Sequence, residues 1–312
     1  SLPASAVNAL RRDALAALTA ARTAPPKRRE LPAPPLPDID CSAEVPQLTL
    51  SVARLEQLSP ALLDLGRPAR VDIPLEEVSR MEALPGEGPA WCGVLPRVWR
   101  DRDEPELRAW LEKARALGFT GVLIGNLGHL PLVRGMGFRL YGDYGLNVFN
   151  SRSLAYLKDK GLESACVSFE LRFAQIRDLK KVLPAEAIVY GRLPLMITEN
   201  CLVQNETGCR LDRQGTCVPK DGPCRGQSNV LRDRTGAAFP LLPAYGHRTE
   251  VQNSRPLYLA DRPDYRRLGL SYARLRFTTE TSEECVRIVR DYLDGAPAGG
   301  DFTRGLYERG VE

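Results

Sequence analysis

The strongest constraint on this chain is a repeated alternation of short apolar segments with segments of helical periodicity. The apolar segments are 48–52, 70–73, 93–98, 121–124, 138–141, 165–169, 187–190 and 273–277. The helical patterns between them lie at 104–117, 153–160, 173–183 and 282–293. Such alternation is typical of parallel strands joined by crossover helices. Eight units of this kind predict an α/β fold of the (β/α)8 TIM-like barrel type, because closure leaves no strand edge unpaired.

The chain ahead of this pattern has a different composition. Residues 1–24 carry apolar side chains at helical spacing and predict an N-terminal helix. Residues 25–45 are rich in proline and include the basic run Lys27-Arg28-Arg29, so we expect an extended linker there. The barrel is then predicted to occupy 46–312, and the 43% hydrophobic content is sufficient for a core of that size.

One connection is much longer than the others. Between the seventh and eighth strands, residues 194–272 are rich in Gly, Asn, Asp, Arg and Cys and show little helical periodicity. The segment also contains large apolar residues and half of the eight cysteines, which argues against disorder. Loops that follow barrel strands lie on the C-terminal face, where barrel enzymes have their active sites. We therefore expect the 194–272 insertion to belong to the active face.

The cysteines of this insertion predict a metal site. Cys201, Cys209, Cys217 and Cys224 have the spacing C-x7-C-x7-C-x6-C, with turn residues between them. Four thiolates that converge in this way suit one tetrahedral ion or one cubane cluster, and the spacing alone does not distinguish zinc from iron. Two local disulfides or four unrelated thiols are the alternatives. His247 is a possible substitute ligand if one cysteine is not used.

Other sequence features narrow the function class. No basic and apolar leader opens the sequence and no apolar run approaches ~20 residues, so we expect a cytoplasmic protein without a membrane span. A net charge of +4 is too balanced to indicate nucleic acid by itself. The motifs G-x-S-x-G and H-E-x-x-H are absent, so the usual hydrolase signatures are missing.

Polar residues at the predicted strand ends are candidate catalytic residues. They are Asp143, Asn147, Asn150, Glu170 and Arg192. Glu170 is a candidate general acid or base, and Arg192 a candidate partner for a carboxylate or phosphate oxygen. The structural alternative is that the two asparagines cap the helix that begins near residue 151, and that Glu170 pairs with Arg192.

Several local motifs together resemble one known family. They are Tyr190-Gly191-Arg192-Leu193-Pro194-Leu195-Met196, Asn200-Cys201, Leu231-Arg232-Asp233-Arg234, Phe239-Pro240, Gly125-Asn126-Leu127-Gly128, the run from Asp143 to Ser151, and Ser168-Phe169-Glu170-Leu171. In this combination the sequence resembles the peptidase U32 (collagenase-like) family over residues 48–311. Residues 5–12 and 302–305 resemble the C-terminal half of longer, clostridial-type members, which implies an upstream domain of the same polypeptide.

The resemblance implies a choice between chemistries. The family is named for collagenase-like proteolysis, but several members are iron–sulfur proteins required for hydroxylating RNA bases or a quinone precursor, with four cysteines holding a [4Fe-4S] cluster. The cysteines of those members are spread further apart, and one of them follows the Phe-Pro element. This chain has Tyr245, Gly246 and His247 in that region.

The leading hypothesis is therefore an iron–sulfur-dependent enzyme that modifies RNA or a small molecule, with zinc as the other candidate metal. A metal-dependent peptidase with Glu170 as general base is the second hypothesis. Four cysteine ligands argue against it, since a closed thiolate site leaves no position for water. The third is a non-enzymatic accessory domain in which the metal site stabilises the insertion.

Overall fold

The computed structural model describes residues 3–211, 217–218, 224 and 229–310, and for 211, 217 and 218 it describes the main chain only. The chain divides into two units, Ser1–Pro35 and Leu36–Glu312. In the first unit the predicted helix is present as α1 (Ala4–Thr23), in which no residue is buried. Its sequence is dominated by Ala, Leu and Arg, which have high helix propensity.

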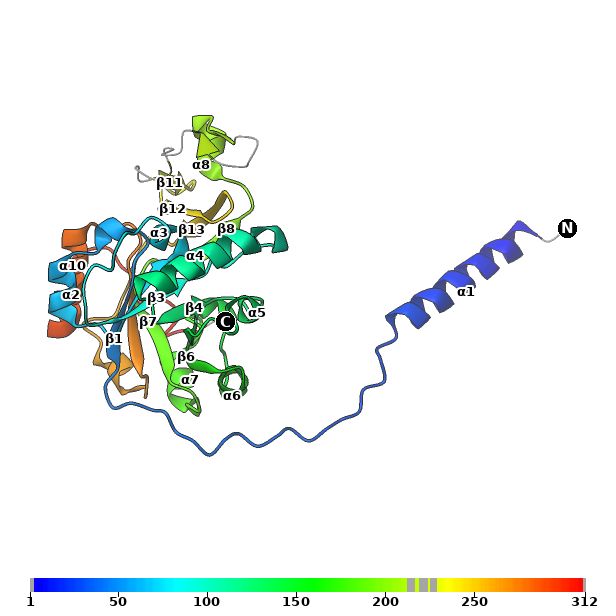
Figure 1. The fold of residues 1–312 in the computed structure, drawn as a ribbon. Helices are drawn as coiled ribbons and strands as arrows, with labels where there is room; N and C mark the ends of the chain where they lie inside the picture. The colour runs from blue at the N-terminus through cyan, green and yellow to red at the C-terminus, as the bar shows by residue number, and fades with distance from the viewer. Residues whose placement is uncertain (1–2, 212–216, 219–223, 225–228, 311–312) are drawn as a thin grey trace. The chain divides into compact units, whose positions relative to one another are not determined.

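The second unit contains the predicted barrel (Figure 1). In its described part, eight parallel strands pair in the order β1-β2-β3-β4-β5-β6-β7-β15, and β15 pairs with β1 to close the ring. Their bounds are β1 (Gln47–Ser51), β2 (Arg70–Pro74), β3 (Ala90–Val94), β4 (Gly121–Ile124), β5 (Arg139–Gly142), β6 (Leu162–Cys166), β7 (Ala185–Gly191) and β15 (Tyr272–Arg276). Every residue of β4 and β7 is buried, as expected for strands covered on both faces.

Most predicted strand bounds differ from the structure by one or two residues, and two differ by more. The third strand ends at Val94 rather than at residue 98, because Pro96 has no N–H to donate to a neighbouring strand. The sixth strand ends at Cys166 rather than at 169, because the chain turns there and the Leu171 N–H donates to the Ser168 carbonyl at 3.2 Å. Apolar residues continue beyond both ends, which explains the late boundaries of the prediction.

Helices cover the outside of the barrel. In the described part of the second unit, the α-helices are α2 (Pro60–Gly66), α3 (Leu75–Val78), α4 (Glu104–Leu117), α5 (His129–Val133), α6 (Ser151–Asp159), α7 (Phe173–Asp178), α8 (Leu202–Thr207) and α10 (Ser282–Asp294). The 3-10 turns are η1 (Leu55–Gln57), η2 (Asp101–Asp103), η3 (Tyr144–Leu146) and η4 (Pro263–Arg267). The predicted helix at 104–117 coincides with α4, and α7 is shorter than the predicted 173–183.

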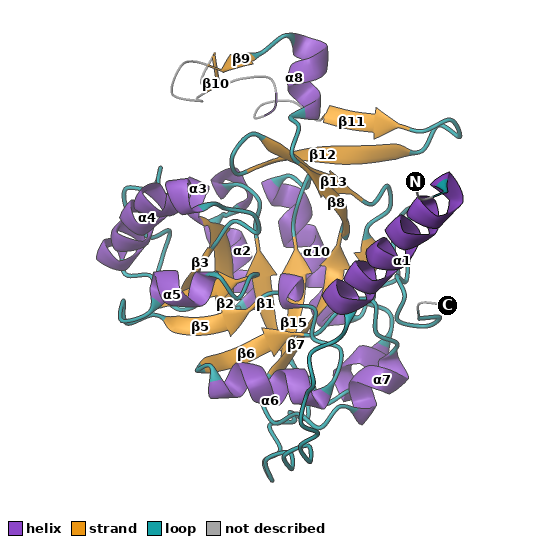
Figure 2. Ribbon diagram, turned by 90° about the vertical axis from the view of Figure 1, so that its right-hand side faces the viewer, coloured by secondary structure: helices purple, strands orange, loops and turns teal. Residues whose placement is uncertain are grey.

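The insertion is more regular than its sequence suggests. Its described residues contain a four-stranded antiparallel sheet, the insertion sheet, in the order β11-β12-β13-β8. The strands of the insertion are β8 (Pro194–Thr198), β9 (Arg210–Leu211), β10 (Cys217–Val218), β11 (Asn229–Arg232), β12 (Ala238–Ala244), β13 (Arg248–Gln252) and β14 (Leu257–Tyr258). Figure 2 shows the insertion sheet above the barrel strands, with α8 and β9 beyond it. The predicted position on the C-terminal face is therefore confirmed.

Candidate functional site

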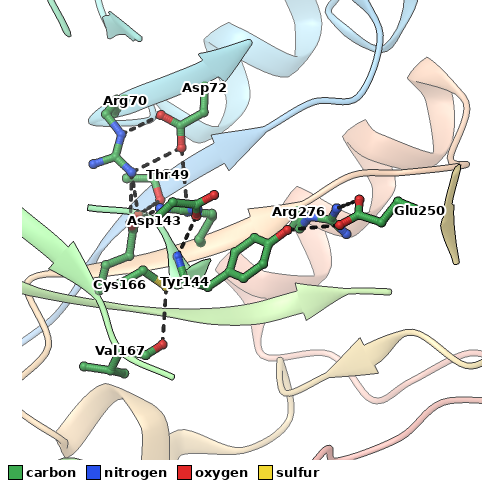
Figure 3. Close-up of polar contacts among 11 residues, drawn as sticks. Thr49, Arg70, Asp72, Asp143, Tyr144, Cys166, Val167, Glu250 and Arg276 are labelled. Carbon is green, nitrogen blue, oxygen red and sulfur yellow. Dashed lines mark hydrogen bonds and ion pairs between the residues drawn. The ribbon is translucent and has the colours of Figure 1, made fainter. Parts of the chain in front are cut away.

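Charged side chains fill the barrel interior below its C-terminal mouth (Figure 3). Five of them, Arg70, Asp72, Asp143, Glu186 and Arg274, form what we call the inner charge cluster, and each is at most 5% exposed. Arg70 Nη2 donates to both carboxylate oxygens of Glu186, at 2.8 and 2.9 Å, and Arg70 Nε donates to Asp72 at 2.6 Å. Arg274 donates to Glu186 and, at 2.5 Å, to Asp143 Oδ1. The cluster thus connects β2, β7, β15 and the end of β5.

The inner charge cluster contains two cations and three carboxylates. Burial alone raises the pKa of Glu186, but Arg274 and Arg70 outweigh it and lower that pKa from 4.5 to about 2. The Thr49 hydroxyl also donates to Glu186, at 2.6 Å. Glu186 is therefore ionised at neutral pH, and the cluster has one more carboxyl group than it has guanidinium groups.

A second group of polar side chains lies above the inner charge cluster, at the C-terminal mouth of the barrel. Glu250 of β13 accepts four hydrogen bonds, from Arg97 Nη1 at 3.1 Å, the Tyr144 hydroxyl at 3.3 Å, Gln252 Nε2 at 3.0 Å and Arg276 Nη2 at 3.1 Å. We call these five residues the mouth cluster. Arg97 follows β3, Arg276 ends β15 and Tyr144 begins η3, so one carboxylate of the insertion joins three barrel strand ends.

Both clusters border one large cavity, the mouth cavity, of about 1900 Å³. From the barrel it is lined by Arg97, Asp143, Tyr144, Arg274 and Arg276. From the insertion it is lined by Ile197, Cys201, Cys224, Leu242, His247 and Glu250. Ile197, Glu250 and Leu242 are paired in register across β8, β13 and β12, so this row of the insertion sheet forms the roof. The cavity lies where barrel enzymes bind their substrates.

Arg248 attaches the insertion sheet to the barrel. Its guanidinium, only 4% exposed, donates to both oxygens of Glu199 at 3.0 Å, and Nη1 donates to the carbonyl oxygens of Tyr245 at 3.1 Å and Val98 at 3.4 Å. The Tyr245 hydroxyl donates to Glu106 of α4 at 2.7 Å. Because Val98 and Glu106 belong to the barrel, these contacts hold the roof of the mouth cavity in place.

We therefore expect Arg248→Gln to loosen the insertion sheet. The change removes a buried cation that satisfies two carbonyl oxygens and one carboxylate, at a cost of about 1–3 kcal/mol. Hydrogen exchange should become faster for the amides of β12 and β13, with little change in β4. Arg255→Gln is the control, since Arg255 is 57% exposed and its one ion pair within the described residues is with Asp301. Equal exchange rates in the two variants would contradict the anchoring role.

The predicted metal ligands have different positions in the insertion. Cys201 is the N-cap residue of α8, and Cys209 follows that helix and accepts a hydrogen bond from the Thr207 hydroxyl at 3.3 Å. Cys201, Cys224 and the alternative ligand His247 line the mouth cavity. Within the described residues, no three His, Cys, Asp or Glu side chains are grouped closely enough to hold a metal ion. The side chain of Cys217 lies outside the described residues, so the four-thiol site stays a prediction.

Thiols and an imidazole are donors that suit zinc and iron–sulfur clusters, so the chemistry of the donor set fits the implied metal. Cys201, Cys224 and His247 come from separate segments of the insertion and share the wall of one cavity. These residues, with Cys209 and Cys217, are the ones that would hold the group.

The candidate catalytic residues are only partly brought together. Asp143 lines the mouth cavity, whereas Glu170, Arg192, Asn147 and Asn150 do not. Asn150 caps α6 by accepting from the Ser153 N–H at 2.9 Å, as the structural alternative proposed, and Asn147 has the left-handed conformation at the end of η3. Glu170 is exposed and forms no ion pair with any described residue. Arg192 donates to the main-chain carbonyls of residues 253 and 254.

The histidines differ in their suitability for catalysis. His129 is fully buried, its Nε2 lies 3.1 Å from the Pro96 carbonyl oxygen, and burial lowers its pKa to about 4. It is therefore neutral near pH 7 and does not line the mouth cavity. His247 does line the cavity, in the left-handed conformation with φ of 61°.

The sequence reasoning missed Arg97, Glu186, Glu250, Arg274 and Arg276. A signal was present for two of them, since Arg274 and Arg276 alternate with apolar residues in a predicted strand and must share one face. A charged pair on a strand that is covered on both sides points to the barrel interior. Glu250 had no comparable signal, because its strand was not predicted.

The fold and the cavity define a TIM-like barrel protein with a polar site at its C-terminal mouth. The model of Peptidase family U32 matches residues 92–271, more than half of the 312 residues, so the chain belongs to this family. No curated protein matches the chain significantly. In the part of the chain that the structure describes, no helix is long and apolar enough to cross a membrane.

Several solved structures are similar to the chain at low sequence identity. The U32 peptidase Mk0906 has 9% identity and a TM-score of 0.41, over 78% of this chain and 98% of its own. A thiamine phosphate pyrophosphorylase from Pyrococcus furiosus has 7% identity and a TM-score of 0.35, over 81% and 97%. A mutant tryptophan synthase α-subunit from the same organism has 11% identity and a TM-score of 0.34, over 47% and 78%.

Proposed function

We propose that the chain is a metal-dependent enzyme that modifies an RNA base or a small polar molecule bound in the mouth cavity. One observation carries the proposal: Cys201, Cys224 and His247 line the same cavity as the strand-end residues Asp143 and Arg274. Cysteine thiolates from the insertion would hold an iron–sulfur cluster, which supplies one-electron redox chemistry when bound. Zinc is the alternative metal for the same ligands.

The residues of the chain itself have distinct roles in this proposal. Arg274 holds the Asp143 carboxylate at the edge of the cavity, where it can accept a proton from a bound substrate or a hydrogen bond. The roof row of the insertion sheet limits the access of water. Peptide hydrolysis has less support, because His129 is buried away from the cavity and Glu170, the candidate general base, does not line it.

The test is anaerobic reconstitution of the purified chain with iron and sulfide. We expect about four iron atoms per chain and a broad visible thiolate-to-iron absorbance band, as for a cysteine-bound cubane. Cys201→Ser and Cys224→Ser should each lose most of the iron. The matched control is Cys41→Ser, because Cys41 precedes β1 and does not line the mouth cavity.

Metal analysis of the untreated protein separates iron from zinc. The cluster proposal is wrong if the reconstituted wild type retains no stoichiometric iron. It is also wrong if Cys41→Ser loses as much iron as Cys201→Ser, since iron would then be bound without regard to the insertion.

A further inference from the structure

The mouth cluster contains more positive charge than its own contacts neutralise. Arg97 and Arg276 share the single carboxylate of Glu250, whose two oxygens already accept four hydrogen bonds. A carboxylate offers about four acceptor sites, so Glu250 has no capacity left for further donors. The mouth cluster therefore carries two cations and one anion.

The cavity wall as a whole also carries other carboxylates, among them Asp103, Glu106 and Glu199, so the excess is a property of the mouth cluster and not of the whole wall. Asp143, the other carboxylate near Arg97, is bonded through Oδ1 to Arg274 and to the Tyr144 N–H at 2.8 Å. The remaining carboxylates of the inner charge cluster, Asp72 and Glu186, are fully buried below. Of the two clusters, the inner one therefore has the additional carboxylate, and the mouth cluster has the additional guanidinium.

Arg97 has the geometry of a binding group. It contacts Glu250 through Nη1, while Nε and Nη2 have no acceptor among the described residues. Nε and Nη2 form the edge of a guanidinium that binds two oxygens of one anion side by side. The side chain is 35% exposed, borders the cavity, and lies over the Tyr144 ring with Cζ 5.1 Å from the ring centroid. Glu250 and the ring hold the guanidinium in position before any ligand arrives.

We propose that Arg97 is an oxyanion subsite of the mouth cavity, which binds a carboxylate or phosphate group of the substrate through its Nε–Nη2 edge. Arg276 lies across the same Tyr144 ring, with Cζ 5.8 Å from the centroid, and adds a second positive charge to the subsite. The inference rests on the proposed function in one respect only, that the mouth cavity is the substrate site.

The test measures binding of inorganic phosphate, benzoate and a nucleoside 5′-monophosphate to the purified full chain by titration calorimetry. Arg97→Gln should weaken binding of at least one of these anions about tenfold or more, equivalent to the loss of one bidentate contact. Arg97→Lys keeps the charge but loses the two parallel N–H donors of the guanidinium. The affinity of this variant for the anion should therefore fall between those of wild type and Arg97→Gln. Arg102→Gln is the charge-matched control, since Arg102 lines the same cavity but is 76% exposed.

The pattern of anion binding distinguishes a phosphate ligand from a carboxylate ligand. Binding of phosphate and the nucleotide, but not of benzoate, assigns the subsite to phosphate groups, and the reverse pattern assigns it to carboxylates. Equal affinities of wild type and Arg97→Gln, or an equal loss in Arg102→Gln, would overturn the proposal. Thermal unfolding of each variant verifies that it is folded. Iron retention is measured in parallel, so that failure of the oxyanion subsite is distinguished from failure of the metal proposal.

Discussion

Arg274→Met is expected to destabilise the protein by about 3–5 kcal/mol, the cost of removing one partner from a buried ion pair. Arg274 is 1% exposed and contacts Asp143 and Glu186 directly, with Asp72 3.6 Å away. Methionine fills a similar volume without charge, so the change isolates the electrostatic effect. In the variant, Arg70 alone would face three buried carboxylates.

The destabilisation caused by Arg274→Met should depend on pH with a definite sign. The pKa of Glu186 is lowered from 4.5 to about 2 in the folded protein, where the arginines outweigh the opposite effect of burial. A carboxylate with a lowered pKa contributes stability that is fully present above about pH 4.5 and is lost as the pH falls towards 2. The difference in unfolding free energy between wild type and Arg274→Met should therefore be largest near neutral pH and shrink in acid.

Urea denaturation at several pH values between about 3 and 7 measures this difference, since the range includes the ordinary pKa of 4.5 and approaches the folded value of about 2. Arg139→Met is the control, because Arg139 also lies in a barrel strand but is 55% exposed beside Glu163. It should cost less than about 1 kcal/mol, as exposed ion pairs do. A pH-independent loss in Arg274→Met would indicate a packing defect and count against the electrostatic account.

Gly191→Ala is expected to lower the free energy of unfolding by a similar amount, for a steric reason. Gly191 is the last residue of β7, and its φ of +121° is a conformation that residues with a Cβ rarely adopt. An added Cβ would lie 2.0 Å from the Arg276 carbonyl oxygen, which is main chain and cannot rotate away. Strain and overpacking, each about 1–3 kcal/mol, together predict a cost of about 2–6 kcal/mol.

This substitution also tests the coupling between β7 and the mouth cluster. Moving the β15 main chain would displace Arg276 from Glu250, so the variant should also expose the roof of the mouth cavity to faster hydrogen exchange. Gly161→Ala is the control, since φ there is +87° and nothing lies within 4 Å of the added Cβ. It should cost only the left-handed strain of about 1–2 kcal/mol. Equal urea midpoints for the two variants would show that the contact with Arg276 is not restrictive.

The barrel was predictable because its signal is local. Each of the eight strands is a short apolar run bounded by turn residues, and the helices between them repeat at their own period, so neighbouring residues reveal both. The errors were also local in origin. Apolar residues continue past Val94 and Cys166, and only Pro96 and the turn at Ser168 mark the true ends.

The insertion sheet could not be predicted in the same way. β8 pairs only with β13 among the described strands, and β13 lies about fifty residues later, so β8 has no nearby partner to reveal it. β12 contains Pro240 and Pro243, and prolines within a segment argue against assigning it as a strand from sequence. The position of the insertion sheet on the C-terminal face was nevertheless predictable, because every loop that follows a parallel barrel strand emerges on the same side.

The sequence by itself therefore determined the barrel, the location of the insertion and the family resemblance, since all three follow from patterns within short segments. The tertiary structure decided which polar residues meet. Arg97 and Arg276 lie far from Glu250 in the chain and contact it only because barrel closure brings β3 and β15 to one mouth and β13 folds across it. Contacts of this kind depend on long-range pairing, and local residue patterns carry no information about it.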